Sequence, residues 1–347
     1  MKPDLPQDIL KGVSRSFYLT LRVLPAEVRP QIGMAYLFCR TADTIADSAL
    51  IPRAERQKIL DIFRNQFKGN TVSFEALGGI SNAAAPDSKA SDEKKLLDSL
   101  PECFKVYLGF SRGDRERIQN LVTILSSGME TDLKRFSGGS QRIPVALRDE
   151  NELDQYCYHV AGIVGEFWTQ MAIAHFPSLK NWNEKELTRA GVHFGKGLQM
   201  TNILKDLSKD LSRGRCYLPH TVLDKHGLKP ADLVPSLPAA RIRPLLSHVI
   251  HLALGHLEEG WKYIMRIPRA EFRLRLACLW PHLFALKTLT EILGSSLILE
   301  PSHTVKISRA SIYNTIIRTG LFYYSNGTLT RYYENLRRRL ILATGTA

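Results

Sequence analysis

The sequence predicts an all-α protein, a single domain built as a wide bundle of helices. Apolar residues recur at helical spacing along nearly the whole chain, whereas few segments show the period-two alternation of β-strands. No fixed-period repeat is evident, which argues against a solenoid. The chain has 347 residues, of which 44% are hydrophobic and 23% charged. It therefore has enough apolar material for a core, and disorder of the whole chain is excluded.

The first part of the chain predicts helices separated by clear breaks. Pro25 and Pro30 bracket a break before the first long helix. Helices are expected at Gln31–Asp47, Arg53–Phe67, Glu93–Leu97 and Asp114–Phe136. From Gly69 to Asp92 the composition changes to Gly, Ser, Ala, Asn and Pro. This predicts a flexible loop over residues 69–92, inserted within one domain that spans residues 1–347.

The second part of the chain predicts longer helices. Asn151 is placed to cap a helix that starts near Glu152. Further helices are expected at Glu184–Asp210, Ala239–Met265, Arg269–Leu293 and Ser308–Thr319, with a shorter one at Leu329–Leu342. Residues 331–347 form a basic tail.

The most apolar stretch is Tyr156–Phe176, and Glu166 lies near its centre. A central acid is unfavourable in a bilayer span, so we interpret this stretch as a buried core helix. Gly162 and Gly165 would let a neighbouring helix approach closely. The N-terminal residues lack the apolar stretch of a signal peptide, which predicts a cytoplasmic protein.

Charge and cysteine content narrow the functional class. Lys and Arg exceed Asp and Glu by 13, which favours an anionic partner such as a nucleic acid, a phosphorylated small molecule or an anionic membrane. The cysteines are dispersed and form no CxxC pair, which argues against a disulfide framework and a zinc site. They are Cys39, Cys103, Cys157, Cys216 and Cys278.

Two acidic sets share the same spacing. Asp43 and Asp47 lie four residues apart, so they share one helix face. A second face carries Asn202, Asp206 and Asp210 in steps of four. Lys205 and Lys209 lie beside these acids, so an alternative interpretation of the second set is a solvent-exposed surface on which lysines and acids pair.

Oxygen ligands without His or Cys suit Mg²⁺, which commonly combines a few carboxylates with water and substrate phosphate oxygens. Two such faces across a cavity would bind a diphosphate bridged by Mg²⁺. Phosphate-binding side chains accompany both sets, since Arg is suited to bidentate phosphate contact. They are Ser14, Arg40, Gln199, Arg213 and Arg215.

Four longer motifs follow the order found in one known family and cover most of the chain up to about Pro219. They are SRSF at Ser14–Phe17, YLFCRTADTIAD at Tyr36–Asp47, YCYHVAGIVGE at Tyr156–Glu166 and GLQMTNILKDLSKDLSRGRCYLP at Gly197–Pro219. The sequence resembles the squalene/phytoene synthase family, the head-to-head trans-prenyl synthases. Two shorter matches lie further along the chain. VKISR at Val305–Arg309 looks like the basic segment of squalene synthase near its reductant site, and RLACLWP at Arg275–Pro281 looks like squalene synthases of bacterial type.

The resemblance implies an isoprenoid-synthase-type helical bundle with a central apolar cavity. It also implies a two-step reaction, in which two farnesyl diphosphates condense to presqualene diphosphate, which is rearranged and reduced by NADPH to squalene. A phytoene, dehydrosqualene or hydroxysqualene synthase without the reductive step is the alternative. A non-catalytic helical protein or a nucleic-acid-binding protein is favoured by charge alone, and the carboxylates argue against both, because without a metal they would repel phosphate.

The resemblance further assigns roles to residues. Tyr156 matches a tyrosine of the first half-reaction, and it acts with Asp43, Asp47, Asp206 and Asp210. The implied Mg²⁺ and diphosphate ligands are Asp43, Asp47, Asn202, Asp206 and Asp210. The implied substrate contacts are Ser14, Phe17, Tyr36, Arg40, Gln199, Asn202, Arg213 and Arg215.

The implied NADPH phosphate contacts are Lys306 and Arg309. Residues 195–197, Gly-Lys-Gly, lack a third glycine and a preceding strand, so a Rossmann-type site is rejected. The chain departs from many eukaryotic squalene synthases in having Ser48 directly after Asp47, where they carry extra acids, and in lacking their C-terminal anchor. The tail from Arg331 mixes aromatic, basic and aliphatic residues, which predicts either peripheral contact with an anionic membrane or a helix packed on the bundle.

Overall fold

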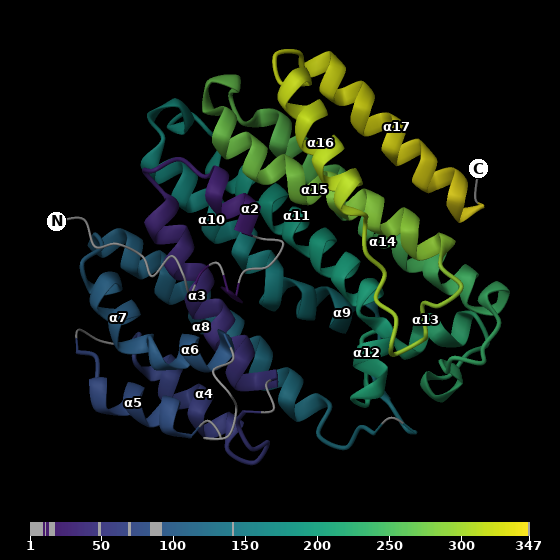
Figure 1. Ribbon diagram of the computed structural model, residues 1–347, viewed down its shortest axis with the longest axis horizontal. Helices are drawn as coiled ribbons and strands as arrows, with labels where there is room; N and C mark the ends of the chain where they lie inside the picture. The colour runs from purple at the N-terminus through teal and green to yellow at the C-terminus, as the bar shows by residue number, and fades with distance from the viewer. Residues whose placement is uncertain are drawn as a thin grey trace. The chain divides into compact units, whose positions relative to one another are not determined.

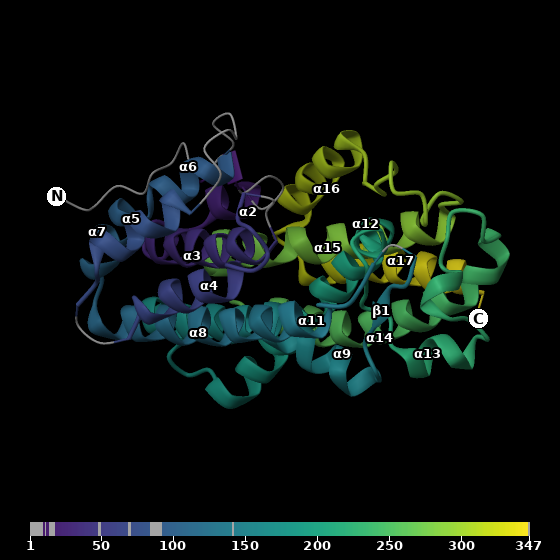
Figure 2. The same ribbon diagram turned by 90° about the horizontal axis from the view of Figure 1, so that it is seen from below.

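The computed structural model describes residues 10, 12–13, 18–47, 50–68, 71–83, 92–140 and 142–345 (Figures 1 and 2). These residues are helical nearly throughout. The described strands are one short parallel pair, β1 (Val145–Ala146) and β2 (Arg215–Cys216). The prediction of an all-α protein is therefore confirmed.

The chain divides into two compact units. The first contains Met1–Lys134 and Glu166–Glu184, and the second contains Arg135–Gly165 and Lys185–Ala347. The sequence predicts no boundary at these positions, and the single domain over residues 1–347 stays a prediction.

The first unit is built around the long helix α3, which packs against α2, α4, α6 and α7. Its helices are α2 (Tyr18–Val23), α3 (Arg29–Asp47), α4 (Arg56–Asn65), α5 (Phe74–Asn82), α6 (Asp92–Asp98), α7 (Leu100–Leu108) and α8 (Arg112–Arg135), with the C-terminal part of α10 (Ile163–His175). Aromatic rings fill its core. The ring centroid of Phe38 lies 4.9 Å from that of Phe67, 4.8 Å from that of Phe104 and 5.6 Å from that of Tyr107. Such tilted and edge-on contacts add to the stabilisation from burial.

The predicted loop over residues 69–92 contains a helix, so that prediction is wrong for Phe74–Asn82. The Ser73 side chain caps this helix by accepting a hydrogen bond from the backbone N–H of Ala76 at 3.2 Å. Leu77 and Ile80 are buried on its inner face. The cap and this apolar pair outweigh the two internal glycines that suggested a loop. Residues 69–70 and 84–91 lie outside the described part of the chain.

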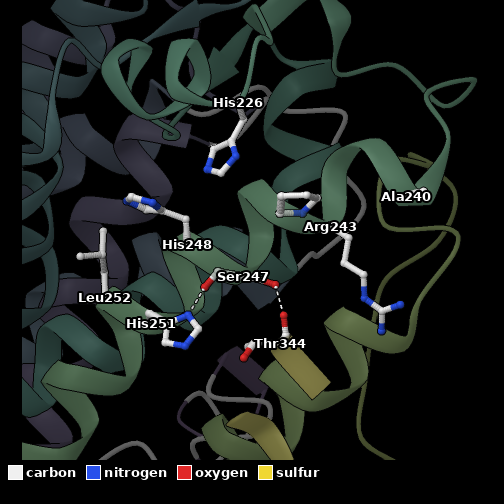
Figure 3. A pocket seen from close by; sticks show the side chains of 9 residues that line it. His226, Ala240, Arg243, Ser247, His248, His251, Leu252 and Thr344 are labelled. Carbon is white, nitrogen blue, oxygen red and sulfur yellow. Dashed lines mark hydrogen bonds between the residues drawn. The ribbon is translucent and has the colours of Figure 1, made fainter. Parts of the chain in front are cut away.

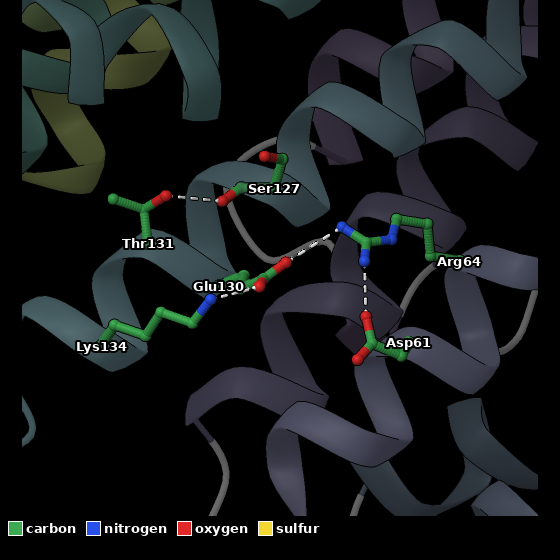
Figure 4. Close-up of polar contacts among 6 residues, drawn as sticks. All are labelled: Asp61, Arg64, Ser127, Glu130, Thr131 and Lys134. Atoms are coloured by element: carbon green, nitrogen blue, oxygen red, sulfur yellow. Dashed lines mark hydrogen bonds and ion pairs between the residues drawn. The ribbon is translucent and has the colours of Figure 1, made fainter.

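An ion-pair relay joins α4 to α8 within the first unit (Figure 4). Arg64 donates to Asp61 at 2.5 Å and to Glu130 at 3.1 Å, and Lys134 donates to Glu130 at 2.6 Å. The hydrogen bond from Lys134, with the help of Arg64, lowers the pKa of Glu130. Glu130 therefore stays ionised and holds the C-terminal part of α8 against α4.

The second unit is dominated by long helices that pack around α15. Helix α15 contacts α14, α16 and α17, and these helices run side by side in Figures 1 and 2. The helices of the second unit are α9 (Glu150–Cys157), the N-terminal part of α10, α11 (Glu184–Lys205), α12 (Leu207–Ser212), α13 (His220–Lys225), α14 (Ala239–Arg266), α15 (Phe272–Gly294), α16 (Arg309–Phe322) and α17 (Asn326–Thr344).

One helix among the described residues, Arg269–Gly294, is long and apolar enough to cross a membrane by length and composition. Its most apolar window is 72% buried within the protein. It contains His282, which is fully buried among the rings of Phe194, Trp261 and Tyr333 at 5.5–5.8 Å. Helix α15 is therefore a core helix of the second unit.

The apolar stretch Tyr156–Phe176 is helical for most of its length, with an irregular turn near its start. A π-helical turn, Tyr158–Gly162, joins α9 to α10. A Cβ atom added at Gly165 would lie 1.9 Å from the carbonyl oxygen of Gly191 on α11. The glycine thus permits close helix packing, as the sequence predicts.

The cap of α9 differs from the prediction. Asp149 has an extended backbone, and its side chain accepts a hydrogen bond from the N–H of Glu152 at 2.8 Å. Asn151 instead lies exposed in the first turn. Both residues are good N-caps by type, and the extended chain that leaves β1 brings Asp149 to the cap position.

Candidate active site

The first acidic set lies at the C-terminal end of α3. Asp43 and Asp47 are half-buried, while the residues between them, Thr44 to Ala46, are buried. The two carboxylates are therefore the polar groups that this end of α3 presents on its accessible face. The helix is continuous through Asp47, so the four-residue spacing places both on one side.

Arg40 connects the first set to a third carboxylate. Its guanidinium forms ion pairs with Asp43 and, at 2.9 Å, with Glu93 on α6. Glu93 carries no signal in the sequence motifs, because its place beside Arg40 depends on how α6 packs against α3. From here on the first acidic set includes Arg40 and Glu93 together with Asp43 and Asp47.

The electrostatics of this set favour a further cation. Burial raises the pKa of the Asp43 carboxyl, Arg40 acts in the opposite direction, and the negative charges of Asp47 and Glu93 raise it again. Two carboxylates thus pair with one guanidinium, and the charge of a third, Asp47, also acts on Asp43. A divalent cation at this point would offset the remaining negative charge.

Tyr36 lies on the same helix, two turns before Asp43. Its hydroxyl donates a hydrogen bond to the carbonyl of Val13 at 3.1 Å. Tyr36 therefore ties α3 to the chain around Val13. The predicted substrate contacts Ser14 and Phe17 lie outside the described residues.

The second acidic set lies where α11 gives way to α12. The predicted helix Glu184–Asp210 breaks at Asp206, whose backbone leaves the helical region at φ −99° and ψ 11°. Helical hydrogen bonds nevertheless run across the break, from the N–H of Asp206 to Asn202 O at 2.8 Å and from the N–H of Asp210 to Asp206 O at 3.0 Å. The three side chains therefore keep their common face.

Lys205 contacts two members of this set. Its ammonium lies 2.9 Å from the Asn202 side-chain oxygen and 3.4 Å from an Asp206 carboxylate oxygen. Paired surface charge is thus present here, as the alternative interpretation expects. The contact involves partly exposed groups, which makes it weak and easily exchanged for a stronger ligand.

The predicted catalytic Tyr156 lies next to the second set. Its ring stacks on Tyr217 with centroids 4.5 Å apart and planes at 25°. The Gln199 amide nitrogen lies 3.5 Å from the Tyr156 hydroxyl. Tyr217 belongs to the motif around Gly197–Pro219, but the sequence alone assigns it no role, because the stacking depends on the return of the chain at β2.

Arg213 and Arg215 flank a tight turn after the second set. Arg213 directly follows α12 and is exposed, and Arg215 is half-buried in β2. Gly214 between them has φ +77°, and its carbonyl oxygen would lie 2.1 Å from a Cβ atom at Gly139. Two glycines are therefore required where this turn meets the segment before β1.

Lys306 and Arg309, the predicted NADPH phosphate contacts, are both exposed, and Arg309 is the first residue of α16. The Ser308 hydroxyl accepts from Ser311 N–H at 3.1 Å and fixes this helix start. Ammonium and guanidinium groups of this kind suit a phosphate. The structure leaves both side chains accessible.

Within the described part of the chain, no three acidic, histidine or cysteine side chains converge into a complete metal site. A divalent ion at either acidic set would complete its shell with water and phosphate oxygens, which is how Mg²⁺ commonly binds. The two sets belong to different units. That they face one another across a cavity stays a prediction.

A pocket of about 760 Å³ lies elsewhere in the second unit (Figure 3). Three histidines, Arg243 and Ser247 line it, and burial lowers the pKa of one of them, His226. The His251 ring nitrogen Nδ1 and the carbonyl oxygen of Ser247 lie 2.7 Å apart. None of the predicted site residues lines this pocket, so we do not assign the reaction to it.

Comparison with known proteins bears on the same residues. The family model described as squalene/phytoene synthase matches residues 10–310, which include every described residue of both acidic sets. The chain belongs to this family. Its members carry out head-to-head prenyl condensation and bind prenyl diphosphates, so the protein is a squalene synthase-like prenyltransferase.

Individual relatives in the family differ in their named products. A presqualene diphosphate synthase of Zymomonas mobilis is 30% identical over 253 residues, which cover 73% of this chain and 72% of the relative. A squalene synthase of Eremothecium gossypii is 25% identical over 339 residues, which cover 96% of this chain and 72% of the relative.

Solved structures share the squalene/phytoene synthase fold. A complex of TcSQS with the ligand BPH1237 superposes with a TM-score of 0.79 at 20% identity, covering 96% of this chain and 90% of that one. A dehydrosqualene synthase in complex with a ligand superposes with a TM-score of 0.62 at 19% identity, covering 92% and 95%. The predicted isoprenoid-synthase fold is thereby confirmed.

Proposed function

We propose that the protein is a squalene synthase that uses farnesyl diphosphate, Mg²⁺ and NADPH. Two farnesyl diphosphates would condense to presqualene diphosphate, which would then be rearranged and reduced to squalene. The observation that carries the proposal is the match to the Eremothecium gossypii squalene synthase over 96% of the chain. A match of that extent includes the accessible Lys306 and Arg309, which suit the phosphate groups of NADPH.

The first half-reaction needs a stable leaving group and a protected carbocation. In our proposal Asp43, Asp47, Asn202, Asp206 and Asp210 hold the metal, and Arg40, Arg213 and Arg215 contact phosphate oxygens. Bound Mg²⁺ would supply positive charge against the diphosphate as it leaves. Arginine contacts strengthen as negative charge develops on the leaving oxygens, which lowers the barrier.

Tyr156 is the proposed proton-handling group of the condensation. Joining the two chains through a cyclopropane ring breaks the bond from one chain to its diphosphate, which leaves, and releases one proton from the carbon that lost it; the other chain keeps its diphosphate. The Tyr156 hydroxyl, next to Gln199 and stacked on Tyr217, is the group that we expect to move that proton. Stacking restricts rotation of the Tyr156 ring and so fixes the direction of its hydroxyl.

A synthase that stops at presqualene diphosphate is the second candidate. The 30% identity to the Zymomonas mobilis presqualene diphosphate synthase favours it. The phytoene, dehydrosqualene and hydroxysqualene synthases remain related alternatives. All share the first half-reaction, so they differ from the leading proposal in their use of NADPH.

Product analysis tests the proposal. The purified protein is incubated with farnesyl diphosphate and Mg²⁺, with and without NADPH, and the lipids are identified by mass spectrometry. We expect presqualene diphosphate without NADPH and squalene with it. Presqualene diphosphate under both conditions would support the second candidate, and absence of diphosphate release would contradict every enzyme assignment.

A pair of variants separates the two half-reactions. Lys306→Gln combined with Arg309→Gln should retain diphosphate release from farnesyl diphosphate but lose most squalene formation at low NADPH. Lys58→Gln changes an exposed lysine on α4 and serves as the control. Equal loss of both half-reactions in the double variant would contradict the NADPH assignment.

A further inference from the structure

Helix α16 buries two of its hydroxyl side chains. Thr315 and Thr319 are fully buried on its inner face. The Thr315 hydroxyl accepts a hydrogen bond from Lys287 at 2.6 Å, and the Thr319 hydroxyl accepts one from the indole N–H of Trp280 at 3.0 Å. Both donors lie on α15. The helix is therefore held to the second unit by buried polar contacts.

The exposed side of α16 carries a row of apolar and aromatic side chains. Tyr313 and Ile317 are each 61% exposed, Leu321 is 70% exposed and Tyr324, just past the helix end, is 79% exposed. Steps of four, four and three residues put these side chains within an arc of about 80°, along about 16 Å of helix. We call these four residues the α16 stripe. A contiguous exposed apolar strip of this kind commonly marks an interaction surface.

Another exposed ring, at the first residue of α15, lies beside the end of the stripe. Phe272 is 46% exposed and its ring lies 5.8 Å from that of Tyr323, which in turn lies 5.4 Å from Tyr324. Arg269 donates to the carbonyl oxygen of Tyr324 at 3.0 Å. This contact fixes the end of the stripe beside an exposed cation.

The chain segment that carries the stripe is positively charged. No aspartate or glutamate occurs between positions 301 and 333, whereas Lys306, Arg309, Arg318 and Arg331 all do. These four side chains are exposed. The combination is an apolar strip with two tyrosines, edged by cations, which matches the interface of an anionic bilayer.

We propose that the α16 stripe is the surface through which the protein rests on an anionic lipid bilayer. Ile317 and Leu321 enter the boundary of the acyl chains, the two tyrosines lie at the level of the head groups, and Arg318 and Arg331 contact lipid phosphates. This binding is separate from the proposed reaction and does not depend on which product forms.

The basic tail from Arg331, predicted from sequence as the membrane contact, is the weaker surface. Among its described residues, Tyr333 and Leu340 are buried against the second unit, and Leu342 is the large apolar residue that is exposed. Arg337 forms an ion pair with Glu258 at 2.6 Å. Helix α17 thus directs its apolar residues inward, opposite to α16.

A second copy of the chain is a poorer occupant than lipid. Pairing two stripes in a symmetric dimer would bring the exposed cations of both copies together. The segment 301–333 offers no carboxylate to neutralise them. Like charges across such an interface oppose association, whereas anionic head groups neutralise the same cations.

Vesicle sedimentation tests the proposal directly. The full-length protein is mixed with vesicles of phosphatidylcholine alone or with 30 mol% phosphatidylglycerol, a composition of about one anionic lipid in three. Ile317→Ser combined with Leu321→Ser should weaken partition into the mixed vesicles by about tenfold or more. Leu342→Ser on α17 is the matched control and should bind like the wild type.

The charge contribution is tested separately. Arg318→Gln combined with Arg331→Gln should lower binding to the phosphatidylglycerol vesicles by about tenfold or more and leave binding to neutral vesicles unchanged. Helical CD spectra verify that every variant is folded. Diphosphate release from farnesyl diphosphate in detergent should stay at the wild-type rate.

Two results would overturn the proposal. One is wild-type vesicle binding by the folded Ile317→Ser, Leu321→Ser variant. The other is a dimeric wild type and a monomeric Ile317→Ser, Leu321→Ser variant, as measured by light scattering, with neither protein binding vesicles. The second result would identify the stripe as a contact between copies of the chain.

Discussion

The two acidic sets have the same residue spacing but different physical surroundings. The first lies on an unbroken helix, where Arg40 bridges Asp43 on α3 to Glu93 on α6. The second lies across a helix break at Asp206, where Lys205 contacts partly exposed groups. One spacing motif is therefore built in two ways, one rigid and partly buried, the other irregular and solvated.

Because their surroundings differ, the two sets should differ in how far their charges affect the stability of the protein as well as ligand binding. In the first set the charged carboxylate of Asp43 is disfavoured by burial and by its acidic neighbours, so a metal or substrate cation would relieve the set. In the second set solvent already screens the carboxylates. We expect variants of the first set to change both activity and stability, and variants of the second to change activity alone.

The largest expected effect is on turnover. Asp43→Asn and Asp206→Asn should each lower the rate of diphosphate release by about 100-fold or more, because each removes a charged ligand of the proposed metal. Asp224→Asn, an exposed acid on α13, should be neutral.

Thermal unfolding of the same variants distinguishes the two sets. Without substrate, Asp43→Asn should raise Tm, because the amide replaces a disfavoured charge. Asp206→Asn should leave Tm unchanged. A marked drop in Tm for Asp43→Asn would mean that the carboxylate serves the ion pair with Arg40 rather than a ligand.

The next largest expected effect is on the pH dependence of stability, and it comes from a buried histidine in the unit that carries the second acidic set. Burial lowers the pKa of His282 to about 3 from 6.5, and neither ring nitrogen has a hydrogen-bond partner among the described residues. The folded state keeps this ring neutral. Its contribution to stability is therefore complete above pH 6.5 and is lost as the pH falls toward 3.

His282→Leu should remove that loss. Between pH 7 and pH 5 the wild type should lose about 2 kcal/mol of unfolding free energy through this group, and the variant should lose correspondingly less. Urea titrations at the two pH values measure the difference. Parallel curves for the two proteins would rule out His282 as the source.

A smaller difference in stability is expected between variants of Arg40 and Lys205, the cations that contact the two acidic sets. Arg40→Gln should destabilise the protein by about 1–2 kcal/mol, because it leaves Asp43 and Glu93 close together without their shared partner. Lys205→Gln should change stability by less than about 0.5 kcal/mol, since exposed pairs contribute little. Equal effects in urea unfolding would remove the distinction between the sets.

The smallest effect concerns how the helix that carries Tyr156 begins. Asp149→Ala should cost about 1 kcal/mol by removing the cap of α9. Asn151→Ala, the cap predicted from sequence, should be close to neutral because its side chain is exposed in the first turn. The reverse order, measured by thermal unfolding, would contradict the cap geometry.

Features of the structure that depend on local, repeating residue patterns could be predicted from the sequence. The long helices α3, α8, α14 and α15 begin and end within about three residues of their predicted bounds, because their apolar spacing persists over several turns. Both acidic sets keep their shared faces for the same reason. Errors occur where two local signals compete, as at Ser73, whose cap outweighs the glycines of the next helix.

Contacts between distant segments could not be predicted from the pattern. Glu93 reaches Arg40 across 53 residues, and Tyr217 stacks on Tyr156 after the chain has passed through α10 and α11. Nothing in the local composition around Glu93 or Tyr217 signals these partners. They follow from which helix faces pack together, which a single sequence does not specify.

The π-helical turn at Tyr158–Gly162 sets the rotational phase of the helix on either side of it. A π-helix has about 4.4 residues per turn, so the five residues of this turn cover nearly the same rotation as four residues of an α-helix. The turn therefore accommodates one extra residue while α9 and α10 keep their relative phase. Deleting one residue within it should restore ordinary winding and leave Tyr156 facing Tyr217, whereas deleting one from the regular winding of α10 before its contacts would rotate α9 by about 100° and turn the hydroxyl away.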